Sequence, residues 1–88
     1  MKNWNIYEEN SVTEFVTSDL QLASYLVALG HRPTRIEGPP HRRCFVFSAL
    51  PSEDVASYYR GGRPLNPQEL FRCYKLMRRS VFEGTLSI

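Results

Sequence analysis

Residues 44–49 (CFVFSA) give the strongest strand signal in the chain. They combine aromatic and β-branched side chains directly after a proline-rich break at residues 38–40 (GPP). In a strand, Phe45 and Phe47 would point to one face of the sheet and Val46 to the other. Apolar side chains on both faces predict a central strand, or a strand with one face reserved for a partner. The rest of the chain must therefore provide neighbouring strands and a covering layer.

Two other segments have the composition of strands. Residues 11–17 (SVTEFVT) are rich in β-branched side chains, and residues 34–37 (TRIE) place Ile36 inward between charged neighbours. The segment 38–42 (GPPHR) contains too much proline for a tight two-residue turn. We therefore expect residues 34–37 and 44–49 to form a hairpin with a longer loop.

Three segments predict helices. The first runs from Leu20 to Leu29, where only Gln21 and Ser24 are polar, with Ser18 as its expected N-cap and a glycine stop. It should be largely buried.

The second predicted helix begins at Ser52 as the N-cap, has Glu53 and Asp54 in its first turn and ends before residues 61–62 (GG). Its apolar side would consist of Val55, Tyr58 and Tyr59. In the third, Asn66 caps a helix that starts with proline and ends at Gly84. One stripe of that helix is apolar, from Leu70 to Val81, and another is basic.

The resulting order is β-α-β-β-α-α. It predicts an α+β fold in which three helices cover a small, mainly antiparallel sheet of about three strands. We expect one domain at residues 11–84, preceded by an extended arm at residues 1–10. Residues 85–88 would form a tail or a short edge strand.

Several short motifs in this order resemble a family of small bacterial and phage domains of unknown function. The motifs are residues 15–20 (FVTSDL), 45–47 (FVF), 58–61 (YYRG) and 65–71 (LNPQELF). The resemblance covers roughly residues 12–80 and implies a prokaryotic or phage origin. It supports the same element order and implies no catalytic residues.

Composition points to an ordinary globular chain, with 42% hydrophobic and 23% charged residues. The longest apolar-rich run, residues 20–29, is too short to cross a bilayer, and the first residues lack the features of a signal peptide. We therefore expect a cytoplasmic protein. The two cysteines, Cys44 and Cys73, form no CxxC motif and are expected to be buried thiols.

The candidate metal ligands and nucleophiles form no recognisable catalytic pattern. His31, His41 and the two cysteines lack the spacing of a zinc site. The glycines at 61–62 lack the pattern of a phosphate-binding loop and are explained as a helix stop. We expect no enzyme activity, no cofactor and no metal.

Basic residues gather in two places and suggest contact with nucleic acid. Residues 31–88 carry a net charge of +5, against −3 for residues 1–30, and nine of the eleven basic residues are arginine. The candidate nucleic-acid contacts are Arg35, Arg42 and Arg43 of the hairpin and Arg72, Lys75 and Arg79 of the third helix, with Arg78 beside them. The alternative is that both clusters are merely solvated surfaces.

Aromatic side chains suggest a protein-interaction module, which is the favoured interpretation. The partner would be another protein or a second copy of this chain, since small domains gain stability from association. The candidate contact residues are Trp4, Tyr58, Tyr59 and Phe71. The alternative is that these aromatic residues belong to the core, which for Trp4 is the expected outcome.

Overall fold

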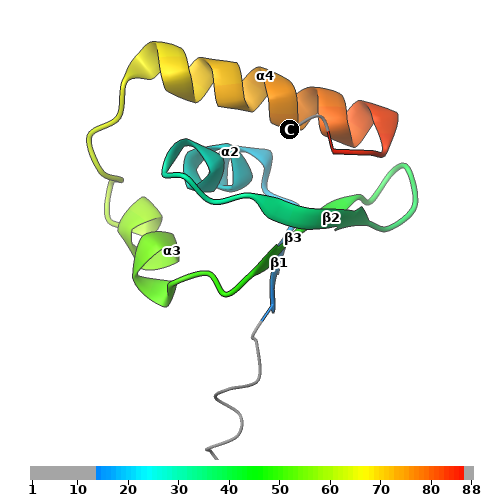
Figure 1. Ribbon diagram of the computed structural model, residues 1–88, viewed down its shortest axis with the longest axis horizontal. Helices are drawn as coiled ribbons and strands as arrows, with labels where there is room; N and C mark the ends of the chain where they lie inside the picture. Colours follow the sequence, from blue (N-terminus) through cyan, green and yellow to red (C-terminus); the bar gives the residue numbers. More distant parts are fainter. Residues whose placement is uncertain (1–13, 87–88) are drawn as a thin grey trace, which may run out of the picture.

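The computed structural model describes residues 14–86. Its elements are β1 (Glu14–Thr17), α2 (Leu20–Ala28), β2 (Pro33–Glu37), β3 (Cys44–Ser48), α3 (Ser52–Tyr59) and α4 (Pro67–Glu83). This α+β arrangement confirms the predicted fold class and element order (Figure 1). The predicted arm at residues 1–10 lies outside the described residues, as do residues 87–88 of the predicted tail. Residues 85–86 of that tail form no strand.

The sheet places β3 in the centre. Its strand order is β1-β3-β2, and β3 is antiparallel to both neighbours. Residues directly opposite each other share a face of the sheet. Phe15 therefore lies on the same face as Phe47, whereas Val16 and Arg35, both opposite Val46, lie on the other. The alternation predicted for residues 44–49 thus holds.

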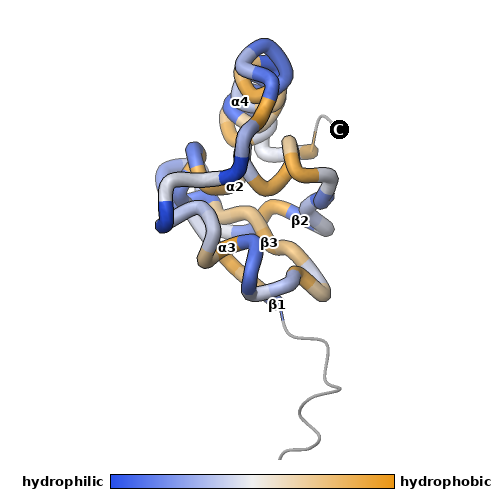
Figure 2. Tube along the Cα trace, turned by 90° about the vertical axis from the view of Figure 1, so that its left-hand side faces the viewer, coloured by the Kyte–Doolittle hydropathy of each residue, from blue (hydrophilic) through white to orange (hydrophobic). Residues whose placement is uncertain are grey.

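Two of the helices, α2 and α4, are stacked on one side of the sheet. Helix α2 lies between the sheet and α4, and α3 flanks the end of α2 (Figures 1 and 2). The shared core is aliphatic and aromatic, and consists of Leu22, Ala23, Tyr25, Leu26, Phe45, Phe47 and Met77. Full burial of one large apolar side chain contributes about 1.5–3 kcal/mol, so this cluster is the main source of stability. The predicted burial of α2 is confirmed.

The helix ends agree with the predictions at α4 but differ at α2 and α3. Asn66 caps α4, its side chain accepting from the amides of Gln68 and Glu69, and Gly84 ends that helix in the left-handed conformation at φ 78°. Helix α2 is capped by Asp19 instead of Ser18, because the Asp19 carboxylate accepts from two first-turn amides. Ser52 lies inside α3, and no side chain caps that helix.

Two side chains have a different environment from the predicted one. Ser24 is buried even though it is polar, because its hydroxyl donates to the carbonyl oxygen of Leu20 one turn earlier. Tyr59, predicted on the apolar side of α3, is instead 69% exposed. Helix α3 has only eight residues, and of its two adjacent tyrosines only Tyr58 packs against the core.

None of the helices within residues 14–86 is long and apolar enough to cross a membrane.

Candidate protein-interaction groove

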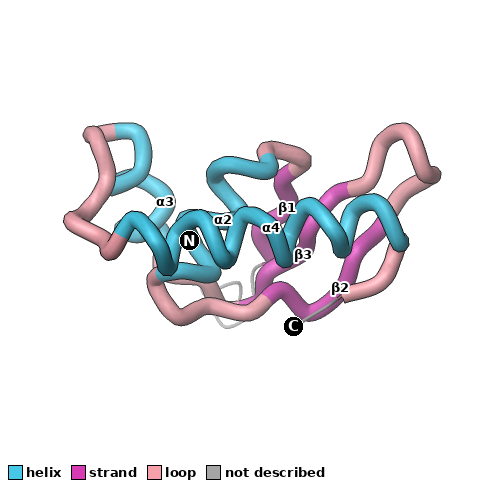
Figure 3. Tube along the Cα trace, turned by 90° about the horizontal axis from the view of Figure 1, so that it is seen from above, coloured by secondary structure: helices cyan, strands magenta, loops and turns pink. Residues whose placement is uncertain are grey.

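An open, largely apolar groove of about 770 Å³ lies where α2, α3, the α3–α4 connection and the start of α4 converge. Figure 3 shows these segments coming together at one end of the molecule. The large side chains that line the groove are Tyr25, Tyr58, Leu65, Leu70, Phe71 and Tyr74. We call this hollow the aromatic groove. The core packing of α2 and α4 fixes its walls.

Tyrosine rings form one wall of the aromatic groove. The rings of Tyr25 and Tyr58 are 5.3 Å apart between centroids, and Tyr59 meets Tyr58 edge-on at 5.2 Å. Desolvation by burial raises the pKa of Tyr58, so its phenol is neutral at physiological pH. The stack holds Tyr58 in place and leaves Tyr59 exposed beside it.

A short chain of hydrogen bonds fixes Tyr25. The amide of Arg63 donates to the Tyr25 hydroxyl oxygen over 3.0 Å, and that oxygen lies 2.6 Å from the Ser57 hydroxyl oxygen. Ser57 donates to the carbonyl oxygen of Asp54, so Tyr25 must be the donor to Ser57. The Tyr25 hydroxyl therefore both donates and accepts inside the protein, and it needs no partner from a ligand.

The carboxylate of Asp54 joins three segments of the protein. They are α3, to which Asp54 belongs, the loop that carries His31 and the α3–α4 connection that carries Arg63. Its carboxylate accepts from His31 Nε2 and from Arg63 Nη2, each over 2.5 Å. The hydrogen bond from His31, followed by the charge of Arg63, holds the pKa of Asp54 below its usual value. The sequence explains Asp54 only as a first-turn acid of α3. Its link to His31, 23 positions earlier, appears only in the fold.

The cysteines and the candidate metal ligands do not come together in the part of the chain that the structure describes. Within residues 14–86, no three His, Cys, Asp or Glu side chains are grouped so that they could hold a metal ion. Both cysteines are free thiols, and Cys44 is only partly buried, contrary to prediction. Cys73 is buried as predicted, and desolvation raises the pKa of its thiol.

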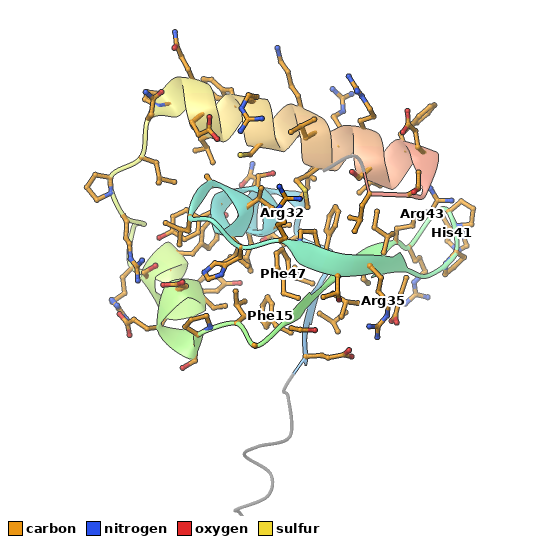
Figure 4. The ribbon with its side chains drawn as sticks, viewed as in Figure 1. Phe15, Arg32, Arg35, His41, Arg43 and Phe47 are labelled. Carbon is orange, nitrogen blue, oxygen red and sulfur yellow. The ribbon has the colours of Figure 1, made fainter. Side chains whose placement is uncertain are left out.

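Three of the six candidate nucleic-acid contacts already have partners within the protein. Arg35 crosses β3 to form two hydrogen bonds with Glu14, at 2.9 and 3.1 Å, and also binds Glu37. These bonds raise the pKa of Arg35 and lower that of Glu14. Figure 4 shows Arg35 on the side of the sheet away from α2 and α4. Arg72 pairs with Glu69 in the first turns of α4.

Arg43 joins the hairpin to the end of α4. Its Nη1 donates to the carbonyl oxygen of Val81 over 2.5 Å (Figure 4). Its guanidinium lies so close to Gly84 that a Cβ there would come within 2.7 Å of it. The last carbonyls of a helix lack intrahelical partners, so Arg43 serves as a cap for α4.

The other three candidates, Arg42, Lys75 and Arg79, are exposed. In the described part of the chain, no hydrogen bond or ion pair involves their side chains. The structure therefore separates the predicted cationic set into residues that hold the fold and residues that remain available.

The residues predicted to contact a protein partner also differ in where they lie relative to the aromatic groove. Tyr58 and Phe71 both line the aromatic groove, and Phe71 is 65% exposed. Tyr59 lies beside the groove, against Tyr58. Trp4 lies outside the described residues. Sequence reasoning missed Tyr25 and Tyr74 as lining residues, because the helical pattern assigns both to buried stripes and does not show where the neighbouring helices diverge.

Comparison with known proteins assigns this chain to no family. A scan against protein-family models matches none, and searches of curated proteins and of solved structures give no match.

Proposed function

We propose that this protein is a non-enzymatic interaction module that associates with a second copy of itself through the aromatic groove. The observation that carries the proposal is the combination of a hollow and exposed rings on one surface. The groove has an apolar lining, and Phe71 and Tyr59, at its edge, are 65% and 69% exposed. Aromatic side chains in such places are typical of interface hot spots.

A two-fold dimer suits this surface because its interface uses the same patch on both copies. The patch is self-complementary because it contains both the groove and the exposed ring of Phe71. Phe71 of each copy would enter the groove of the other. The chain has only 88 residues, and small domains bury a limited share of their apolar surface when they fold alone. Association would bury rings that otherwise face water.

The charges of the groove favour an apolar protein contact over nucleic acid. Among the described residues that line the groove, Arg63 is the only charged one, and its guanidinium is bound to Asp54. A partner that covers the groove would therefore bury no unpaired charge, which would be costly at an interface. A phosphate backbone would find no available cation there.

Sedimentation velocity of the full chain over a wide concentration range tests the proposal. We expect a reversible monomer–dimer equilibrium that Phe71→Ala weakens about tenfold or more, since truncating a hot-spot residue costs about 2 kcal/mol. Phe82→Ala is the matched control. It removes the same ring from the same helix at an exposed position outside the groove.

Two results would contradict the proposal. One is a monomer at every concentration. The other is a dimer that Phe71→Ala leaves intact, or that Phe82→Ala weakens equally. A dimer that Trp4→Ala abolishes and Phe71→Ala does not would show that the contact runs through the N-terminal segment and not through the groove.

A further inference from the structure

A second surface on α4 lies outside the aromatic groove. Lys75, Arg78, Arg79 and Phe82 occupy positions i, i+3, i+4 and i+7, and all four are exposed. This spacing places them on one side of the helix, within roughly two turns, or about 10 Å along its axis. We call these four residues the basic face of α4.

The cations of this face are not used by the fold. Within residues 14–86, no ion pair or hydrogen bond engages the side chains of Lys75, Arg78 or Arg79. Arg72, one turn earlier, is by contrast tied to Glu69. The only acid in the last three turns of α4 is Glu83. The face therefore presents three positive charges with little local compensation.

Phe82 adds an aromatic ring to these charges. At 88% it is the most exposed large apolar side chain in the described part of the chain. A single exposed phenylalanine is unremarkable by itself, but this one stands one turn beyond Arg78 and Arg79 and two turns beyond Lys75. A cation-rich surface with an accessible ring is the combination on which single-stranded nucleic acid binds, through phosphate contacts and base stacking.

The hairpin loop lies near the end of this positive surface. Arg43 holds the β2–β3 hairpin against the carbonyl end of α4, as Figure 4 shows. The exposed His41 and Arg42 precede Arg43 in the same loop. The backbone of Arg42, next to Arg43 in the chain, consequently lies near the end of α4 at which Phe82 stands. The fold therefore brings part of both sequence clusters to one end of the molecule.

From this arrangement we infer that the basic face of α4, continued by Arg42, binds single-stranded nucleic acid. The three cations contact successive phosphates, and Phe82 stacks on a base. An anionic membrane fits the face less well, because an interfacial helix needs a broad apolar stripe and this face has one ring among three cations. The surface shares no residue with the groove lining.

Fluorescence anisotropy of labelled oligo(dT), titrated with the full chain across a salt series, tests this inference. Three phosphate contacts by the basic face of α4 to a single strand predict a slope of about −2 for log affinity against log salt, and a fourth contact through Arg42 would make it about −3. The double variant Lys75→Gln with Arg79→Gln should reduce the magnitude of that slope by about 1.4. Phe82→Ala should weaken binding about tenfold while leaving the slope unchanged.

The control is Arg60→Gln, which removes one exposed positive charge from the end of α3, where Arg60 pairs with Glu53. Binding that this control reduces as much as the double variant does would overturn the inference in favour of general charge attraction. Three other results would overturn the inference. They are no oligo(dT) binding at low salt, oligo(dT) binding that Phe82→Ala leaves unchanged, and co-sedimentation of the protein with phosphatidylserine vesicles in place of oligo(dT) binding.

Discussion

The two sides of α4 both carry apolar side chains, and these have opposite environments. On the side that faces α2, Cys73 is 1% exposed and Met77 is fully buried. On the other side, Phe71 is 65% exposed and Phe82 is 88% exposed. One side of a 17-residue helix is enough to complete the core, so the other side is available for contacts with other molecules. Burial, and not residue type, separates the residues that fold the domain from those proposed to bind.

The largest expected effect is the loss of a buried side chain from the inner side of α4. Met77→Ala should lower the free energy of unfolding by about 2–5 kcal/mol, because it leaves a cavity among α2 and β3 residues. Phe82→Ala removes a larger side chain and should change that free energy by less than about 0.5 kcal/mol. Urea denaturation of both variants measures the difference. Similar losses would show that the two sides do not differ as described.

A smaller effect is expected where an arginine caps the helix. Arg43→Ala should lower the free energy of unfolding by about 1 kcal/mol, because it removes the donor to the Val81 carbonyl at the end of α4. Arg79→Ala removes the same charge from an exposed position on the same helix and should have almost no effect. Thermal denaturation monitored by circular dichroism compares the two. Equal melting temperatures would contradict the capping role.

The smallest expected effect concerns pH. The pKa of Asp54 is lower in the folded protein than in the unfolded chain, mainly because of His31. Its stabilising contribution is therefore complete above the unfolded pKa of about 3.9 and is lost as the pH falls through the lower folded value.

Melting temperatures measured from neutral pH down to about pH 3 examine this contribution. Asp54→Asn should melt at a lower temperature than wild type at neutral pH, and its loss of stability in acid should be smaller. Glu53→Gln, in the same turn of α3 but exposed, serves as the control. An Asp54→Asn profile parallel to wild type would show that this carboxylate does not link His31 and Arg63 as described.

Much of the fold could be predicted from local pattern. The strand at residues 44–48, the buried α2, the Asn66 cap and the Gly84 stop all depend on neighbouring residues, and the structure confirms each of them. The predicted caps Ser18 and Ser52 were wrong because an adjacent residue took the position in each case. At α2, Asp19 lies next to Ser18, and both have side chains that could cap a helix.

The surfaces could be predicted less well because they depend on tertiary contacts. Arg42 and Arg43 are adjacent in sequence, yet Arg43 caps α4 and Arg42 remains exposed. Likewise, Tyr58 and Tyr59 are adjacent, yet only Tyr58 lines the groove. Neither periodicity nor composition distinguishes such neighbours, because the decisive partner lies on a distant segment.

One measurement tests the central claim that two copies of the chain associate through the aromatic groove. It is a dilution series of ¹H–¹⁵N correlation spectra of the full chain. We predict concentration-dependent shifts at the amides of Tyr59, Gly61, Gly62 and Phe71, around the groove, and constant shifts on the sheet at Arg35 and Val46. Shifts confined to the sheet, or none at any residue over the whole series, would contradict the account.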